Sequence, residues 1–334
     1  MKTLKICNKK VALGTQKFLS LAVARRSVSE IEIPVTIING VKDGPLLGII
    51  AGEHGCEYPG IMTTLKLSQE ISPKELSGVL AILPIVNVPS FENRTMWVNP
   101  IDQDRLWDKY PGKLDGTMSQ IITYNVFHEI ILKCNYVLHL HSGDLNEALF
   151  PHIIFRKTGK KDVDNILNDF VSLFKMQYAL EYHEPEGNGT LLVEASKRGI
   201  PTILLESGQK GVLDEESVNL FYNGILNVMK YLKMIKGKPT FTKPTMLSGA
   251  VDVLAKNGGI LHSYVKLGTY VKKGELLGEI LNVRGEIAEK IKSPTDGVAL
   301  AHVTWAAVDP GFLPQLYTNY LYEIGRAGSA EKSR

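Results

Sequence analysis

The sequence has little cysteine, no excess of either charge and no long apolar run. The three cysteines, Cys7, Cys56 and Cys134, are odd in number and widely spaced, which argues against a disulfide framework. The 38 basic and 35 acidic residues leave a net charge of +3, so nothing in the charge indicates nucleic acid or an acidic membrane surface as a partner. No run approaches the roughly 18 apolar residues of a membrane span, and the polar N-terminus has no apolar signal-peptide core. We therefore expect a cytoplasmic protein with reduced thiols and a small molecule as its partner.

The composition is that of an ordinary globular protein, with 44% hydrophobic and 22% charged residues in a chain of 334. That length predicts two domains. Gly237, Pro239 and Pro244 mark a change of character, so we place the domains at residues 1–240 and 241–334. A homo-oligomer stays an open possibility, because many soluble proteins form one, but no residue in the sequence indicates it.

Residues 1–240 alternate between strand-like and helix-like stretches. Apolar runs at 46–51, 79–87, 136–141 and 201–205 indicate buried strands, and helical spacing of apolar residues indicates helices near 59–71, 117–133, 161–178, 190–198 and 214–235. Such alternation predicts an α/β fold with a mostly parallel or mixed sheet that has helices on both faces. In sheets of this kind, ligands bind beyond the carboxyl ends of the strands.

Residues 241–334 instead read as a small all-β domain. Glycines divide short β-runs at 260–265, 276–281 and 297–303. The stretches 265–280 and 292–298 are similar to the hairpins of biotinyl and lipoyl carriers, but no lysine lies in a carrier turn between them. We predict a packing domain without a swinging arm.

Three predicted strands end in residues that can bind a metal. The run 46–51 leads into a turn with His54 and Glu57, the run 136–141 ends at His141, and the run 201–205 leads to Glu206. A catalytic zinc takes about three protein ligands and keeps one position open for water. We predict His54, Glu57 and His141 as the ligands of one Zn²⁺ per chain, and Glu206 as the general base.

Each assignment has an alternative. His139 shares a strand face with His141, so the two could exchange roles. Glu206 could be a solvated glutamate at a strand end. Cys56 could bind zinc as a thiolate, although its spacing favours a small buried residue, and Asp144 could either orient a histidine ring or simply form a turn. Cobalt or nickel would fit the same ligands as zinc.

Together, the stretches 52–57, 139–144 and 204–208 resemble the succinylglutamate desuccinylase/aspartoacylase family, relatives of the zinc carboxypeptidases. The resemblance extends from about residue 30 to 326 and includes the β-region. It implies a zinc-dependent hydrolase that cleaves an amide bond, often by removing an acyl group from an amino acid. By that resemblance His54, Glu57 and His141 match the zinc ligands and Glu206 matches the catalytic glutamate.

The long polar loop from 89 to about 116 departs from the family pattern. Members usually carry Asp-Xaa-Asn-Arg-Xaa-Phe-Pro-Gly there, whose Asn-Arg binds a substrate carboxylate, whereas Trp107 and Asp108 fall at those two positions here. We expect Arg94 or Arg105 to supply the missing cation from nearby. If Asp108 instead faces the substrate, it favours a neutral or cationic molecule.

The sequence therefore predicts a zinc amidohydrolase of the N-deacylase type. Two alternatives stay open: a metallocarboxypeptidase that acts on small peptides, and a metal-binding protein of the same fold that has lost catalysis. The acyl group, the amine and the native metal are not fixed by the sequence.

Overall fold

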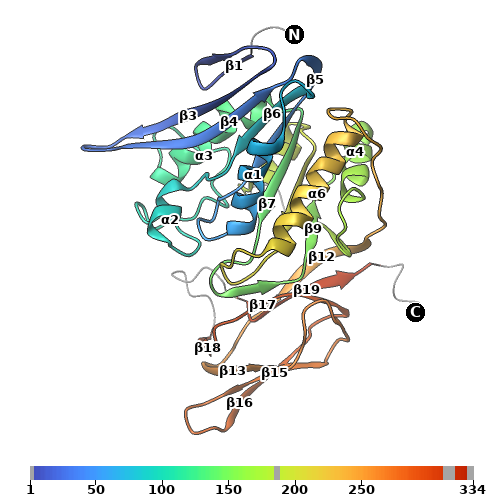
Figure 1. Cartoon of the computed structure of the whole chain (residues 1–334). Coiled ribbons are helices and arrows are strands. Elements are labelled where there is room, and N and C mark those ends of the chain that lie inside the picture. The colour runs from blue at the N-terminus through green and yellow to red at the C-terminus, as the bar shows by residue number, and fades with distance from the viewer. Residues whose placement is uncertain (1–3, 184–188, 311–319, 329–334) are drawn as a thin grey trace.

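The structure is a computed structural model that describes residues 4–183, 189–310 and 320–328 (Figure 1). Its main feature is a 13-stranded sheet within those residues. In chain order the strands of this sheet are β3 (Thr15–Arg25), β4 (Glu30–Asn39), β5 (Lys42–Ile50), β6 (Ser77–Leu83), β7 (Tyr136–His141), β8 (Glu147–Leu149), β9 (His152–Phe155), β10 (Tyr178–Glu181), β11 (Thr202–Glu206), β12 (Thr245–Val253), β14 (Tyr270–Val271), β17 (Gly297–Val303) and β19 (Tyr322–Ala327).

The sheet is mixed, and its parallel centre carries the strands that matter for the site. Its order is β14-β17-β19-β12-β10-β9-β11-β7-β5-β6-β4-β3, and β8 pairs with β17 outside this path. Strands β6, β5, β7 and β11 run parallel to one another, whereas β9 is antiparallel to β11. The predicted α/β fold with a mixed sheet is confirmed.

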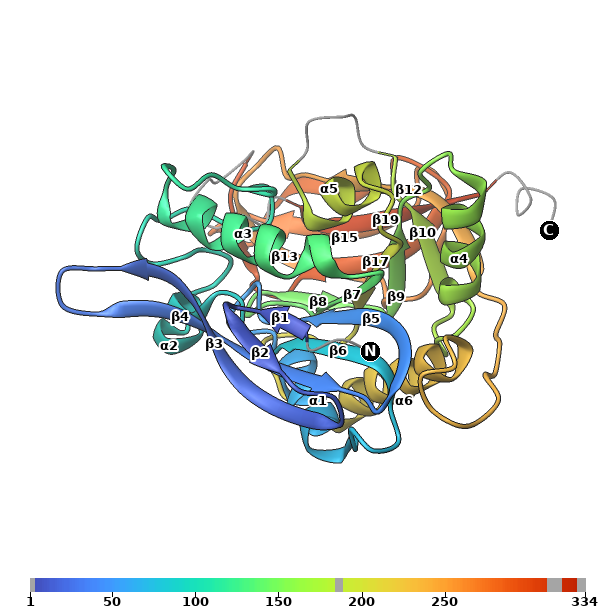
Figure 2. The same cartoon turned by 90° about the horizontal axis from the view of Figure 1, so that it is seen from above.

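Helices cover both faces of the central strands (Figures 1 and 2). On one face lie α1 (Tyr58–Glu70), α4 (Lys161–Val171) and α6 (Glu215–Tyr231), and on the other lie α3 (Met118–Glu129) and α5 (Leu191–Lys197). The shorter α2 (Val88–Asn93) and the 3-10 turn η1 (Ile131–Lys133) complete the described helices. Among the described residues, no helix combines the length and the apolar character needed to cross a membrane.

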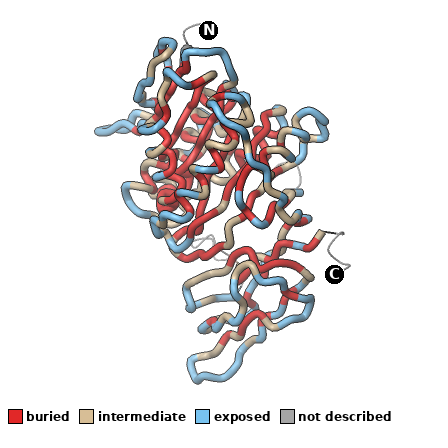
Figure 3. The backbone as a smooth tube through the Cα atoms, turned by 45° about the vertical axis from the view of Figure 1, so that its right-hand side comes forward, coloured by how far each residue is buried: buried red, intermediate tan, exposed pale blue. Residues whose placement is uncertain are grey.

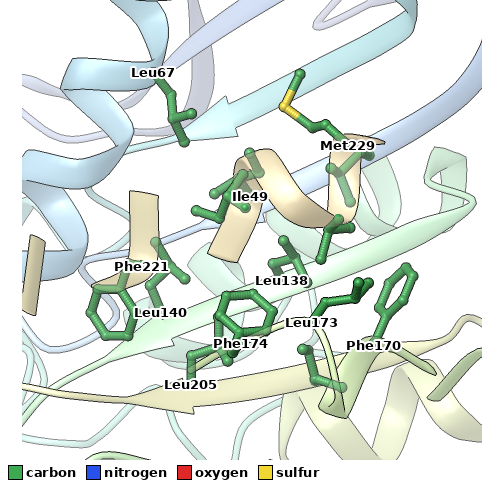
Figure 4. Close-up of a cluster of buried hydrophobic side chains, with 14 of the residues drawn as sticks. Ile49, Leu67, Leu138, Leu140, Phe170, Leu173, Phe174, Leu205, Phe221 and Met229 are labelled. Carbon is green, nitrogen blue, oxygen red and sulfur yellow. The ribbon is translucent and has the colours of Figure 1, made fainter. Parts of the chain in front are cut away.

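The alternation of side chains along the central strands determines on which face of the sheet the polar site residues lie. Leu138, Leu140 and Leu205 point into the apolar cluster beneath α1, α4 and α6, where they meet Phe170 and Phe221 (Figure 4). Successive strand residues point to opposite faces. The polar residues between and beyond these leucines therefore face the other side of the sheet, towards α3 and α5.

The C-terminal region extends the main sheet and adds a second one. Strands β12, β14, β17 and β19 belong to the main sheet, in which β12 pairs with β10 in parallel register. Four further strands form an antiparallel sheet in the order β16-β15-β13-β18. Their bounds are β13 (Gly259–Ser263), β15 (Leu276–Leu281), β16 (Ile287–Lys292) and β18 (Ala307–Val308).

This region has its own apolar cluster, which includes Leu277, Ile280 and Tyr322. In Figure 3 its backbone is more exposed towards β16 than where it joins the main sheet. Because one sheet passes through both parts of the chain, the division at residue 240 stays a prediction. A short hairpin of β1 (Leu4–Ile6) and β2 (Lys9–Val11) packs beside β3.

The structure differs from the sequence prediction where elements are short. Strands β8, β9 and β10 have three or four residues, too few for a period of two to stand out. The predicted helix 161–178 ends at Val171. Beyond its end, Phe174 packs against Gly224 of α6, where a Cβ on Gly224 would lie 2.0 Å from the phenylalanine ring. The loop predicted from residue 89 begins with α2.

Candidate active site

The three predicted strand ends meet at one edge of the sheet. Strand β7 lies between β5 and β11, and all three run parallel, so their carboxyl ends point the same way. In this register Glu206 is the direct partner of His141. Directly paired residues share a sheet face, which places the proposed base beside a proposed ligand.

The turn after β5 depends on two glycines. Gly52 has φ +65°, and a Cβ there would lie 2.8 Å from the Cα of Ile85. A Cβ on Gly55 would lie 2.3 Å from the backbone nitrogen of Phe91 in α2. Glycine is therefore required at both positions, and it allows the turn that carries His54 to lie tightly against the start of α2.

The side chains of His54, Glu57 and His141 converge in one buried group. Nδ1 of His54 is 2.8 Å from Oε1 of Glu57, and Nδ1 of His141 is 3.0 Å from Oε2. Their potential ligand atoms all lie within 4.8 Å of one another. Glu57 is the N-cap of α1 but makes no capping hydrogen bond with its side chain. Its carboxylate therefore stays available for a cation.

The charges of this group are strongly coupled. Burial opposes the charge on His54, but the carboxylates of Glu57, Glu53 and Asp144 outweigh it and raise the pKa of His54 to about 9. Burial likewise opposes the charge on Glu57, yet His141 and His54 lower its pKa to about 2. Without a metal, the group thus holds a proton where a cation would bind.

A second group of buried side chains, Glu53, His139 and Tyr110, lies behind His141. Nε2 of His141 is 2.9 Å from Nε2 and 3.3 Å from Nδ1 of His139. Nε2 of His139 is 3.2 Å from Oε2 of Glu53, which also accepts a hydrogen bond from the hydroxyl of Tyr110 at 3.2 Å. Because Glu53, His139 and His141 could themselves hold a metal, the alternative role of His139 keeps a structural basis.

The carboxylate partners of the two histidines favour His141 as the ligand. A carboxylate only accepts, so Nε2 of His139 donates to Glu53 and Nδ1 of His141 donates to Glu57. A zinc ion in place of the Nδ1 proton of His141 would lie beside Glu57 and His54, whereas His139 is directed to Glu53. A metal-binding histidine commonly has its other ring nitrogen hydrogen-bonded to a neighbouring group, and Nε2 of His141 contacts His139 in this way.

Two tryptophans of the long loop lie against the histidines. The ring of Trp97 is 4.7 Å from that of His54, and the ring of Trp107 is 5.5 Å from that of His141. Trp97 has φ +61°, and Asp144 accepts a hydrogen bond from its backbone N–H at 2.9 Å. Asp144 thus anchors the loop, and its burial raises its pKa to about 6.

Trp97, Tyr110 and Glu53 were not among the predicted site residues. Glu53 directly precedes His54 at a predicted strand end, and that position was a usable signal. Tyr110 and Trp97 lie in a loop, where sequence spacing does not fix side-chain direction. Cys56 is buried with its thiol 3.8 Å from the carbonyl of Thr95, and burial raises its pKa to about 11, which disfavours a thiolate.

The predicted substrate-binding residues of the loop pair with one another. Arg105 donates from Nε and Nη2 to Oδ2 of Asp108 at 2.9 and 2.7 Å, and Nζ of Lys109 lies 2.9 Å from Oδ1. Asp108 is therefore balanced by two cations. Arg94 is exposed at the end of α2. A role for these three predicted residues in substrate binding stays a prediction.

Glu206 lies among other carboxylates. Burial is the largest cause that raises the pKa of Glu206 well above its usual value. The charges of Glu57, Glu147 and Glu323 raise this pKa further. Its Oε2 has no hydrogen-bond partner among the described residues. A carboxyl in such surroundings can accept a proton readily once a nearby cation offsets the repulsion.

Known proteins share both sequence and fold with this chain. A family model described as the succinylglutamate desuccinylase/aspartoacylase catalytic domain matches residues 43–232. The N-alpha-acetyl-L-2,4-diaminobutyric acid deacetylase of Halomonas elongata is 24% identical over 288 residues, which cover 84% of this chain and 83% of that protein.

Two solved structures show the same fold. The product-bound ectoine utilization protein EutE (DoeB) from Ruegeria pomeroyi has a TM-score of 0.83 at 21% identity, and covers 94% of this chain and 95% of its own. A succinylglutamate desuccinylase/aspartoacylase from Rhodobacter sphaeroides has a TM-score of 0.84 at 20% identity, with 98% and 100% covered.

Zinc binding should depend on pH through His54. Zinc needs the neutral imidazole, and the pKa of His54 without metal is about 9. The apparent association constant should therefore rise about tenfold per pH unit from neutral pH and level off above the pKa of His54. Chelator competition at several pH values measures this, and an affinity independent of pH would contradict it.

The contacts of Glu53 and His139 behind His141 should also control zinc affinity. Glu53→Gln removes the carboxylate that accepts from Nε2 of His139 and so weakens the contacts that hold His139 against His141. We expect zinc to bind about 10- to 100-fold more weakly, with a change in the ¹⁵N shifts of His139 and His141. Glu75→Gln, on an exposed residue before β6, is the control. Unchanged affinity and shifts in Glu53→Gln would refute the role.

Proposed function

Because the chain belongs to the succinylglutamate desuccinylase/aspartoacylase family, we propose that it is a zinc-dependent hydrolase that removes the acyl group from an N-acyl amino acid or a related small amide. The family model matches more than half of the 334 residues, which confirms the family expected from the strand-end motifs. The observation that carries the proposal is the convergence of His54, Glu57 and His141 beside Glu206.

The ligand group fits zinc. Two imidazoles and one carboxylate are a common catalytic zinc set, and a single negative charge leaves the Zn²⁺ centre net positive. The raised pKa of His54 supports a demand for positive charge at this place. Bound zinc would polarise the amide carbonyl and lower the pKa of water.

Glu206 is the proposed general base. Its carboxylate takes a proton from the attacking water and later gives it to the leaving nitrogen. Its position as the strand partner of His141 supports this role. A positive zinc centre nearby would lower the raised pKa of Glu206 and so favour the carboxylate that accepts the proton.

The named relative supports an amino acid as the amine half of the substrate. The Halomonas elongata protein is a deacetylase of an acetylated diamino acid. We propose an acetyl or similarly small acyl group here as well. Trp97 and Trp107, which lie against the two ligand histidines, offer apolar surface near the reacting carbonyl.

The named relative favours a deacylase over a carboxypeptidase, because it is a deacetylase of an acetylated amino acid. Both activities act on a substrate with a free carboxylate, for which a bidentate arginine is the usual partner. Arg105 already donates two hydrogen bonds to Asp108. Peptide hydrolysis from the C-terminus is therefore kept as the alternative activity.

Metal content and turnover together test the proposal. The purified protein should hold about one zinc per chain and hydrolyse a member of a panel of N-acetyl amino acids. His54→Ala should lose both zinc and activity, because it removes a ligand. Glu206→Gln should keep zinc but turn over about 10²- to 10⁴-fold more slowly.

Glu75→Gln is the control for these variants and should match the wild type. Stoichiometric zinc with no turnover of any amide would favour the metal-binding protein without catalysis. Absence of bound zinc would refute the proposed centre. Release of C-terminal amino acids from small peptides, without deacylation, would favour the carboxypeptidase.

A further inference from the structure

The carboxylates beyond Glu206 point to what the substrate must carry. We propose that Glu147, Glu323 and His152 form a subsite for a primary ammonium group on the amine half of the substrate. The inference rests on the proposed function and specifies its substrate class. The three residues come from β8, β19 and β9, and none of them lies in a stretch that the sequence motifs had singled out.

Strand register places Glu147 and Glu323 on one sheet face. Strand β17 lies between β8 and β19, and Glu147 pairs with Val303 while Glu323 pairs with Ala301. Paired residues share a face, as do residues two apart on a strand. Both carboxylates therefore rise from the same face, and Ala301 between them brings no charge.

In the described part of the chain, no cation balances these carboxylates. Among residues 4–183, 189–310 and 320–328, none of Glu147, Glu206 and Glu323 forms an ion pair. Glu147 accepts a hydrogen bond from the hydroxyl of Tyr320, which is neutral. Carboxylates gathered in a low-dielectric place repel one another unless a positive charge joins them.

His152 adds an independent observation. It pairs with Glu206 across β9 and β11, so His141, Glu206 and His152 form a row on one face. Its Nδ1 lies 2.8 Å from the carbonyl of Phe150, which can only accept, so Nδ1 carries the proton. Nε2 is then a lone pair, and it has no partner in the part of the chain that the structure describes, although His152 is only 2% exposed.

His152 lies next to Glu206 in the sheet, and Glu147 and Glu323 also lie near enough to Glu206 for their charges to raise its pKa, so we infer that one donor group can serve all of them. A buried polar group without a partner is costly, and an ammonium offers three N–H donors to these three acceptors. The position fits the chemistry, because Glu206 returns its proton to the leaving nitrogen. The amine half of the substrate therefore lies next to Glu206 and within reach of the subsite.

Binding of free amino acids tests the subsite without turnover. We would titrate the zinc-loaded protein with 2,4-diaminobutyrate and with 2-aminobutyrate, which lacks the second amine, by calorimetry. The diamino acid should bind about 10- to 100-fold more tightly. Glu147→Gln and Glu323→Gln should each reduce that ratio about tenfold, whereas Glu75→Gln should preserve it.

His152 has its own pair of variants. His152→Leu removes the acceptor and should reduce the same ratio, whereas His152→Gln keeps an oxygen acceptor and should restore part of it. Zinc content and melting temperature verify that each variant is folded. Partial rescue by glutamine distinguishes an acceptor from a residue that only fills space.

Kinetics extend the test to Nα-acetyl-2,4-diaminobutyrate, N-acetylnorvaline and N-acetylaspartate. The amine-bearing substrate should have the highest kcat/KM. Equal binding of the two free amino acids, or a preference for N-acetylaspartate, would overturn the inference. If no substrate turned over while the binding ratio stood, the proposed function would fail and the ammonium subsite would remain.

Discussion

The site depends on one constraint, the parallel alignment of β5, β7 and β11 at the centre of the sheet. Because their carboxyl ends share an edge, residues from three distant parts of the chain meet there. The apolar cluster beneath α1, α4 and α6 determines which side chains of each strand point away from the site. A slip of one residue in β7 would turn His141 into that cluster and bring Leu140 to the site.

The second constraint is the continuity of the main sheet into the C-terminal region. Strand β17 pairs with both β8 and β19, and so joins Glu147 of the first part to Glu323 of the second. The predicted packing region thereby contributes an acidic side chain near Glu206. In our proposal the central strands carry the zinc ligands and the general base, and the strands that extend the sheet carry the residues that bind the amine of the substrate.

The sequence was sufficient for the fold class, the family and the convergence of the strand ends, because long apolar runs and their polar ends carry that information. It was insufficient for His152, Glu147 and Glu323, which lie on short or C-terminal strands whose pairing is decided by tertiary contacts. It also missed that Arg105 and Asp108 bind each other. Loop residues follow no regular repeat, so their sequence does not indicate where their side chains point.

The most direct test of the central claim is the position of the metal in crystals of the zinc-loaded protein, located by anomalous scattering at the zinc absorption edge. The account predicts one strong peak per chain, bound by Nδ1 of His54, the carboxylate of Glu57 and Nδ1 of His141. A peak among Glu53, His139 and Nε2 of His141 instead, or no peak at this edge of the sheet, would contradict it.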